Sequence, residues 1–74
     1  MTTKDRWRQI LAAPTTPSKR IDNKYYGLVH LAKNKAGAIS KAKLYREQDN
    51  VQARVFQDTD WHGKLRFWVA VRLP

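Results

Sequence analysis

The stretch Lys64-Leu65-Arg66-Phe67-Trp68-Val69-Ala70-Val71-Arg72-Leu73 decides the fold, because its residues alternate in character along its whole length. Successive side chains of a strand point to opposite faces of the sheet. One set of alternate positions is wholly apolar and predicts a core-facing side: Leu65, Phe67, Val69, Val71 and Leu73. The other set presents basic side chains around one indole: Lys64, Arg66, Trp68, Ala70 and Arg72. The stretch therefore predicts a strand with one buried face and one cationic, aromatic face.

The residues before this strand complete a hairpin. Positions 51–58 alternate between an apolar set that includes Val51, Ala53 and Val55 and a second set that includes Arg54 and Phe56. Residues 59–63 have the composition of a turn, and a glycine at its end is free to take a positive φ. We therefore expect an antiparallel hairpin over residues 51–73.

The N-terminal part of the chain predicts a helix followed by a loop. Residues 3–13 carry apolar side chains at the i, i+3, i+4 spacing of a helix: Trp7, Ile10 and Leu11. Pro14 ends this segment, and residues 14–23 contain two prolines, so we expect a loop there. Lys19 and Arg20 lie inside the expected loop and form a candidate mobile basic arm.

The middle of the chain is ambiguous between helix and strand over residues 24–37 and again over residues 39–46. In the first interpretation both segments are strands, since turn-like breaks recur about every dozen residues, as in a meander. This gives an α+β fold in a single domain over residues 1–74, in which the N-terminal helix precedes a three- to four-stranded antiparallel β-meander within residues 24–73. The alternative is a winged helix-turn-helix, with helices near 3–13, 24–35 and 40–48 and the hairpin 51–73 as its wing.

The charge of the chain points to an anionic partner. The 74 residues include 15 Lys and Arg against 6 Asp and Glu, a formal net charge of +9. This excess favours nucleic acid, either DNA or RNA, or an acidic protein surface. There is no cysteine, which excludes thiolate metal sites and agrees with a cytoplasmic location. No apolar run is long enough for a spanning helix, so we expect no membrane association. There is no Gly-rich phosphate loop, and we expect no cofactor.

If residues 39–46 form a strand, the outward side chains of three strands combine into one basic and aromatic surface. Cations on it would contact phosphates, and exposed rings would stack on bases. The predicted nucleic-acid-binding residues are Lys41, Lys43, Tyr45, Arg54, Phe56, Arg66, Trp68 and Arg72, with Lys19 and Arg20 as a secondary basic arm. If helix 3–13 instead covers the Trp68 face, the same aromatic residues form a second core layer.

Two other functions compete with nucleic-acid binding. The first is a small inhibitor or adaptor, of the kind found in phages and mobile elements, that docks on an acidic protein surface through Trp, Tyr and Arg. The second is a metal-dependent nuclease built on Asp58, Asp60 and His62. A polar hairpin turn explains these three residues better, because a metal site needs ligands from several elements. We therefore expect a binding protein and not an enzyme, with no metal site.

Overall fold

The computed structural model describes residues 2–74 as two helices and four strands. Their order is α1 (Thr3–Ala12), β1 (Ser18–Ile21), β2 (Lys24–Ala32), α2 (Lys35–Asp49), β3 (Gln52–Thr59) and β4 (Leu65–Arg72). The strands form one antiparallel sheet in the order β1-β2-β4-β3. The predicted α+β class, the N-terminal helix, the antiparallel sheet and the C-terminal hairpin are confirmed.

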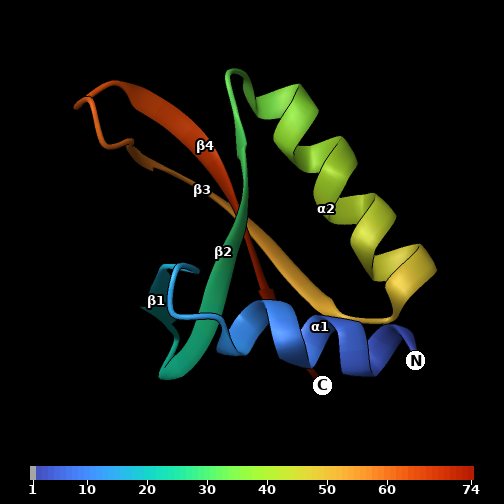
Figure 1. The fold of residues 1–74 in the computed structure, drawn as a ribbon. Helices are drawn as coiled ribbons and strands as arrows, with labels where there is room; N and C mark the ends of the chain where they lie inside the picture. The colour runs from blue at the N-terminus through green and yellow to red at the C-terminus, as the bar shows by residue number, and fades with distance from the viewer. Residues whose placement is uncertain (1) are drawn as a thin grey trace.

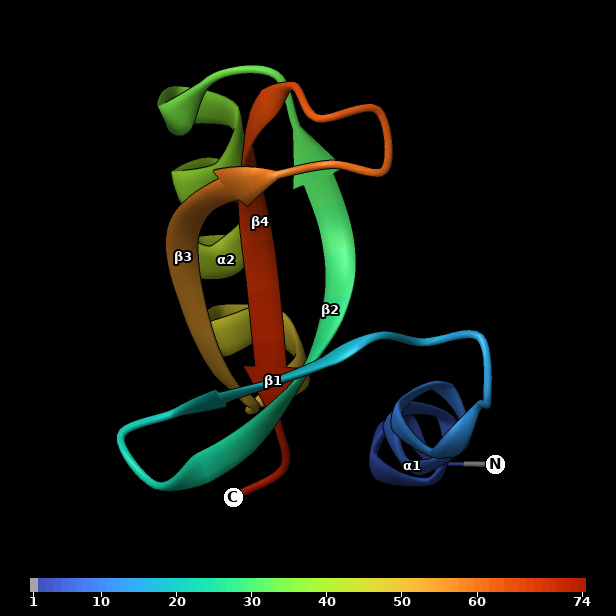
Figure 2. The same cartoon turned by 90° about the vertical axis from the view of Figure 1, so that its left-hand side faces the viewer.

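Helix α2 packs on one side of the sheet, and the sheet curls so that its edge strand β1 crosses over the other side. Figure 2 shows α2 behind β4 and β1 crossing in front of β4, and Figure 1 shows the same layers from the side. Because β2 and β3 both run antiparallel to β4, they are parallel to each other, and α2 connects them across one face. We call the face under α2 the inner face and the face crossed by β1 the outer face.

The strand expected over residues 39–46 is wrong, since these residues belong to α2. Asn34 caps the helix by accepting a hydrogen bond from the Gly37 N–H at 2.8 Å, and Asn50 ends it in the left-handed conformation. Ala38 and Ala42 are completely buried, so their small side chains let the helix approach the sheet closely. The sheet therefore is not a simple meander, because a helix separates its two hairpins.

The winged-helix alternative is also wrong. It requires a helix over residues 24–35, whereas residues 24–32 form β2. Aromatic and β-branched residues favour a strand there, and the single glycine, Gly27, lies where α1 crosses β2. A Cβ at Gly27 would clash with the Leu11 Cδ2 of α1, so the end of the Leu11 side chain would have to move to make room for it.

The expected loop over residues 14–23 contains β1, so Lys19 and Arg20 lie on a strand and not on a mobile arm. A two-residue turn joins β1 to β2, and both of its residues, Asp22 and Asn23, have positive φ. Asp and Asn tolerate this conformation better than other non-glycine residues, as a tight hairpin turn requires. The local sequence thus encodes a hairpin, but with a weaker signal than Asn-Gly or Asp-Gly.

The main core lies between the inner face and α2. It consists of small and medium-sized side chains: Ala32, Ala38, Ala42, Val51, Ala53, Val69 and Val71. α1 closes one end of this core through Trp7, whose ring packs edge-on against Tyr45 of α2 at 5.0 Å between centroids. The Trp7 indole N–H also donates a hydrogen bond to Asp49 at 2.8 Å.

Candidate functional site

The structure divides the predicted binding residues between the two sides of the sheet. The strand register places one group on the outer face: Arg54, Phe56, Arg66, Trp68 and Arg72. The other three, Lys41, Lys43 and Tyr45, lie on α2, on the opposite side. The single surface that the sequence predicted for all eight residues is therefore not formed.

Two ion pairs join the edge strand β3 to the β1–β2 hairpin across the outer face. Lys19 of β1 pairs with Asp58 of β3 at 3.2 Å, and Arg54 of β3 pairs with Asp22 in the β1–β2 turn. We call these four residues the clasp. They link the β1–β2 hairpin to β3 across the outer face, although β2 and β4 separate β1 from β3 in the sheet order.

The ion pairs of the clasp engage two cations that the sequence analysis predicted to contact phosphates of a nucleic acid. The Lys19 ammonium lies 4.4 Å from the centre of the Phe56 ring, and the Arg54 guanidinium lies 5.8 Å from that of buried Tyr26. The hydrogen bond to Asp22 raises the pKa of Arg54. The Thr59 backbone N–H, with Lys19, lowers the pKa of Asp58. Both cations thus face a carboxylate within the clasp, and Phe56 has a cation over its ring.

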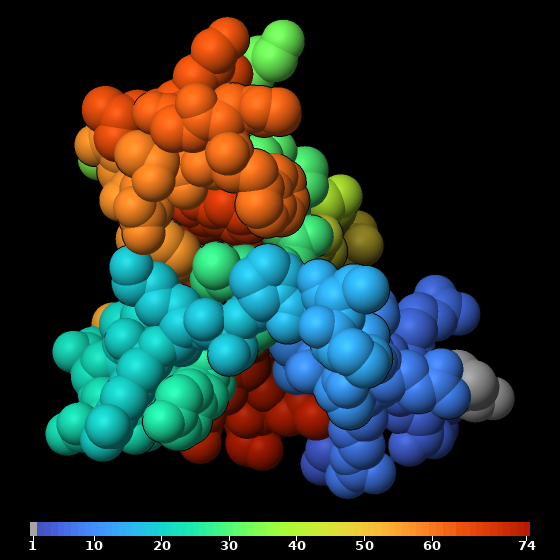
Figure 3. Space-filling view, turned by 60° about the vertical axis from the view of Figure 1, so that its left-hand side comes forward, coloured from blue at the N-terminus to red at the C-terminus, as the bar shows by residue number. Residues whose placement is uncertain are grey.

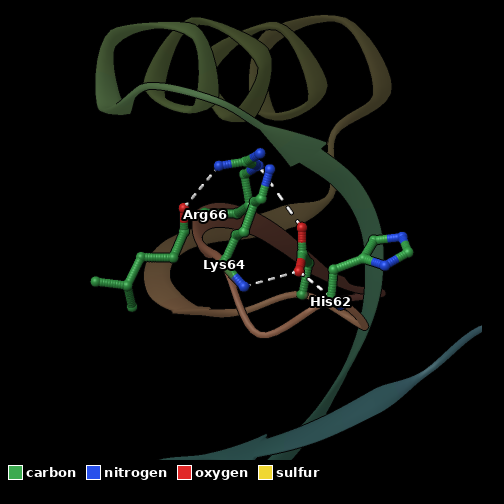
Figure 4. A network of polar contacts seen from close by, with 5 residues as sticks. His62, Lys64 and Arg66 are labelled. Carbon is green, nitrogen blue, oxygen red and sulfur yellow. Dashed lines mark hydrogen bonds and ion pairs between the residues drawn. The ribbon is translucent and has the colours of Figure 1, made fainter.

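The loop between β3 and β4 is organised by Asp60 (Figure 4). One carboxylate oxygen accepts the backbone N–H groups of His62 and Lys64, at 2.8 Å and 3.0 Å, and the other lies 3.7 Å from Arg66 Nε. Burial opposes ionisation of Asp60, but these N–H groups and the Arg66 charge prevail and lower its pKa. Among residues 2–74, no three His, Asp or Glu side chains come together as a metal site. Asp60 thus acts as a turn residue.

Two tryptophans meet beside this loop. Trp68 on β4 is buried, with 7% of its surface exposed, whereas Trp61 in the loop keeps 76% exposed. Their rings make an edge-to-face contact at 5.6 Å between centroids. Little of Trp68 is thus accessible to a ligand, whereas most of the Trp61 ring is, although Trp61 was not among the residues predicted from the sequence. The sequence feature that points to Trp61 is the presence of a tryptophan inside a polar turn.

A groove of about 280 Å³ opens between Trp61 and the segment after α1. Trp68, Leu28 and Leu31 line it from the sheet, and Thr15, Thr16 and Pro17 line the other side. Figure 3 looks onto this face: the orange hairpin overhangs the hollow, and the blue-to-cyan chain borders it below. We call it the Trp61 groove.

The predicted residues on α2 take part in its own packing. The Tyr45 ring is half-buried against Trp7, and Lys41 lies 5.3 Å from the ring centre. Burial, with the nearby charge of Asp49, raises the pKa of Tyr45. Lys43 lies 4.0 Å from Glu47 on the exposed side. These residues do not meet the Trp61 groove.

All six acidic side chains are engaged within the chain. Five form ion pairs: Asp5, Asp22, Glu47, Asp58 and Asp60. The sixth, Asp49, accepts the Trp7 indole N–H. The five pairs use five different cations of the fifteen, so ten Lys and Arg have no acidic partner within residues 2–74.

Three of these ten cations gather at one end of the sheet. Lys33 and Lys35 follow the end of β2, and Lys64 precedes the start of β4. The register pairs Ala32 with Phe67, so these two connections lie at the same end, as Figures 1 and 2 show. We call Lys33, Lys35 and Lys64 the end cluster. It lies at the end of the sheet where the hairpin carries Trp61.

No protein-family model, curated protein or solved structure matches this chain. Within the described residues, neither α1 nor α2 combines the length and the apolar character that crossing a membrane requires.

Proposed function

We propose that this chain is a small, non-enzymatic protein that binds nucleic acid, with Lys and Arg contacting phosphates and an aromatic side chain stacking on a base. The balance of charges carries the proposal. Every acidic side chain has an internal partner, whereas ten cations form no ion pair with an acidic side chain within residues 2–74. A surface with so many unpaired cations attracts a polyanion and releases its counterions on binding.

The end cluster is the best candidate for the phosphate contacts. Its three lysines have no acidic partner among the described residues, and all three are exposed. Arg66, two residues after Lys64, is paired with Asp60, and Lys19 and Arg54 are paired within the clasp. Arg72, whose guanidinium contacts the neutral Gln52 side chain at 3.3 Å, keeps its charge available at the other end of β4.

A salt series tests this proposal. We would titrate the nuclease-treated protein into a fluorescently labelled single strand and into a duplex. Three phosphate contacts predict that log K falls against log[salt] with a slope of about −2 on a single strand and about −3 on a duplex. Lack of binding at low salt, or a slope near zero, would contradict the proposal.

A pair of matched variants locates the contacts. Lys33→Gln with Lys64→Gln removes two charges from the end cluster, whereas Lys4→Gln with Lys24→Gln removes two exposed charges elsewhere, on α1 and at the start of β2. The first pair should weaken binding more. It should also make the slope of log K against log[salt] shallower, by the amount that about two phosphate contacts contribute. Equal losses in both pairs would mean that the net charge, and not the end cluster, drives binding.

The competing function is docking on an acidic protein surface. It makes a different prediction in the same experiment, because a protein-binding module would show no saturable binding to oligonucleotides at moderate salt. It would instead bind one protein partner in a complex that survives nuclease treatment.

A further inference from the structure

The Trp61 groove lies on the outer face, and its dimensions limit what it can hold. Its volume of about 280 Å³ is just below the range of about 300–1,000 Å³ for pockets that hold drug-sized ligands. One or two fused rings are the size of ligand that suits it. Its lining includes two indole rings and aliphatic side chains, which favours a flat, largely apolar group.

Trp61 is held in place before any ligand arrives. Asp60 accepts backbone N–H groups from His62 and Lys64, and the Asp60 N–H in turn donates to the Lys64 carbonyl at 2.8 Å. These bonds fix the loop on both sides of Trp61, while Trp68 contacts the indole edge-on. A largely exposed aromatic ring on a fixed loop loses little conformational entropy on binding.

The groove also carries polar groups. Thr16 uses its hydroxyl to donate to the Ile10 carbonyl at 2.7 Å. Within residues 2–74, the Thr15 hydroxyl and the His30 ring form no such bond, and both residues line the groove. A hydroxyl and an imidazole can each donate and accept hydrogen bonds. They suit the edge of a heterocyclic ring better than a purely apolar ligand.

We propose that the Trp61 groove binds one unpaired base of a single-stranded nucleic acid, with the base stacked on Trp61 and the adjacent phosphates on the end cluster. This rests on the proposed function and adds the strand state and the base-binding site. A base in a duplex is stacked on both faces and paired along its Watson–Crick edge, so it does not enter such a groove unless it is extruded. The net charge of +9 favours a phosphate-bearing occupant over an apolar peptide.

The test separates stacking from phosphate binding. We would compare a labelled oligothymidylate, an abasic strand with the same number of phosphates and a duplex of equal length, all at one moderate salt concentration. The wild-type protein should bind the oligothymidylate about 5-fold to 150-fold more tightly than the abasic strand, as expected for stacking of one base. It should also prefer the oligothymidylate to the duplex.

Trp61→Ala should remove the preference for bases and leave affinity for the abasic strand unchanged. Trp61→Phe, which keeps a ring, should restore part of the preference. Tyr25→Ala is the matched control, since Tyr25 is also exposed, at 69%, but does not line the groove. This control should keep the full preference, and a thermal melt should verify that each variant folds.

The outcomes distinguish the two proposals. If the wild-type protein binds no strand, including the abasic one, the proposed function fails. If it binds the abasic strand and the oligothymidylate equally, or if Trp61→Ala keeps the preference, nucleic-acid binding stands and the groove proposal is overturned. Preference for the duplex, or a groove that binds only a protein ligand, would also overturn it.

Discussion

The two faces of the sheet are built from the same alternating strands but are covered in different ways. The inner face meets α2 through alanine and valine side chains, and none of residues 2–74 is a buried polar residue. The outer face is crossed by a short strand, fastened by the clasp and left open at the Trp61 groove. One face thus provides stability by close packing, and the other combines charged pairs with an accessible aromatic ring.

This comparison shows that alternation predicts which residues share a face but not what covers that face. Arg54, Phe56 and Trp68 share a face as expected. Their surroundings come from β1 and the 60–64 loop, which the alternation does not describe. Variants on each face should therefore differ in the size of their effects and in their dependence on salt and pH.

The largest effect is expected on the inner face, from Ala42→Leu. Ala42 is completely buried where α2 touches the sheet, so three extra carbon atoms would push the helix away. Overpacking of this kind should lower the free energy of unfolding by about 3 kcal/mol, measured by urea denaturation. The control is Ser40→Leu, on an exposed position of the same helix, which should change it by less than about 0.5 kcal/mol. Similar losses from both variants would contradict the close packing of α2.

A smaller effect is expected where α1 closes the core. Trp7→Phe keeps an aromatic ring but removes the N–H that bonds to Asp49. Since hydrogen bonds to charged groups contribute more than neutral ones, we expect a loss of about 1–2 kcal/mol. A double-mutant cycle with Asp49→Ala should show a coupling energy of similar size. Additive effects would mean that the Trp7 ring, and not its hydrogen bond, holds α1.

Local patterns predicted the parts of the fold that local forces decide. The hairpin 51–73 and helix 3–13 have clear periodicities, and both are present. Residues 39–46 were ambiguous, because Lys41, Lys43 and Tyr45 alternate with apolar residues as a strand requires. The Asn34 cap and the two buried alanines favour a helix. The alanines do so because their small side chains let the helix pack closely on the sheet, a contact that the local sequence does not show.

The candidate site depended more strongly on contacts that are distant in sequence. The clasp joins residues 39 and 32 positions apart, and no local pattern indicates such pairs. The Trp61 groove forms because residues 15–17 lie opposite the 60–64 loop. A tryptophan inside a polar turn was the one local sign of this site.

The clasp should contribute little to stability, and its contribution should depend on salt. Arg54 and Asp22 are both well exposed, so water and ions screen their interaction. Arg54→Ala should lower the Tm slightly at low salt and hardly at all in about 1 M salt. Arg72→Ala is the matched control on the same face, because Arg72 bonds to the neutral Gln52 and its effect should not depend on salt. If Arg54→Ala has the same effect at both salt concentrations, the ion pair is not what holds the β1–β2 turn.

The last prediction concerns the loop that carries Trp61. Its effect on stability should be the smallest at neutral pH, but it should depend most specifically on pH. The pKa values of Asp58 and Asp60 are lower in the folded protein than their ordinary value of 3.8. The unfolded chain therefore takes up protons first on acidification. The stabilisation is complete above this ordinary value and is lost as the pH falls through the lower pKa values of the folded state.

Asp60→Asn keeps an oxygen that can accept the His62 and Lys64 N–H groups but no longer titrates. This variant should therefore lose less stability than the wild-type protein between about pH 5 and pH 2, measured as the urea midpoint. Asp5→Asn is the control, because it removes a carboxylate on α1 and leaves the loop intact. Protonation of Asp60 also weakens the contacts on both sides of Trp61, so the fluorescence of a Trp7→Phe variant should change over the same pH range. A fluorescence change that persists in the combined Trp7→Phe, Asp60→Asn variant would show that another group positions Trp61.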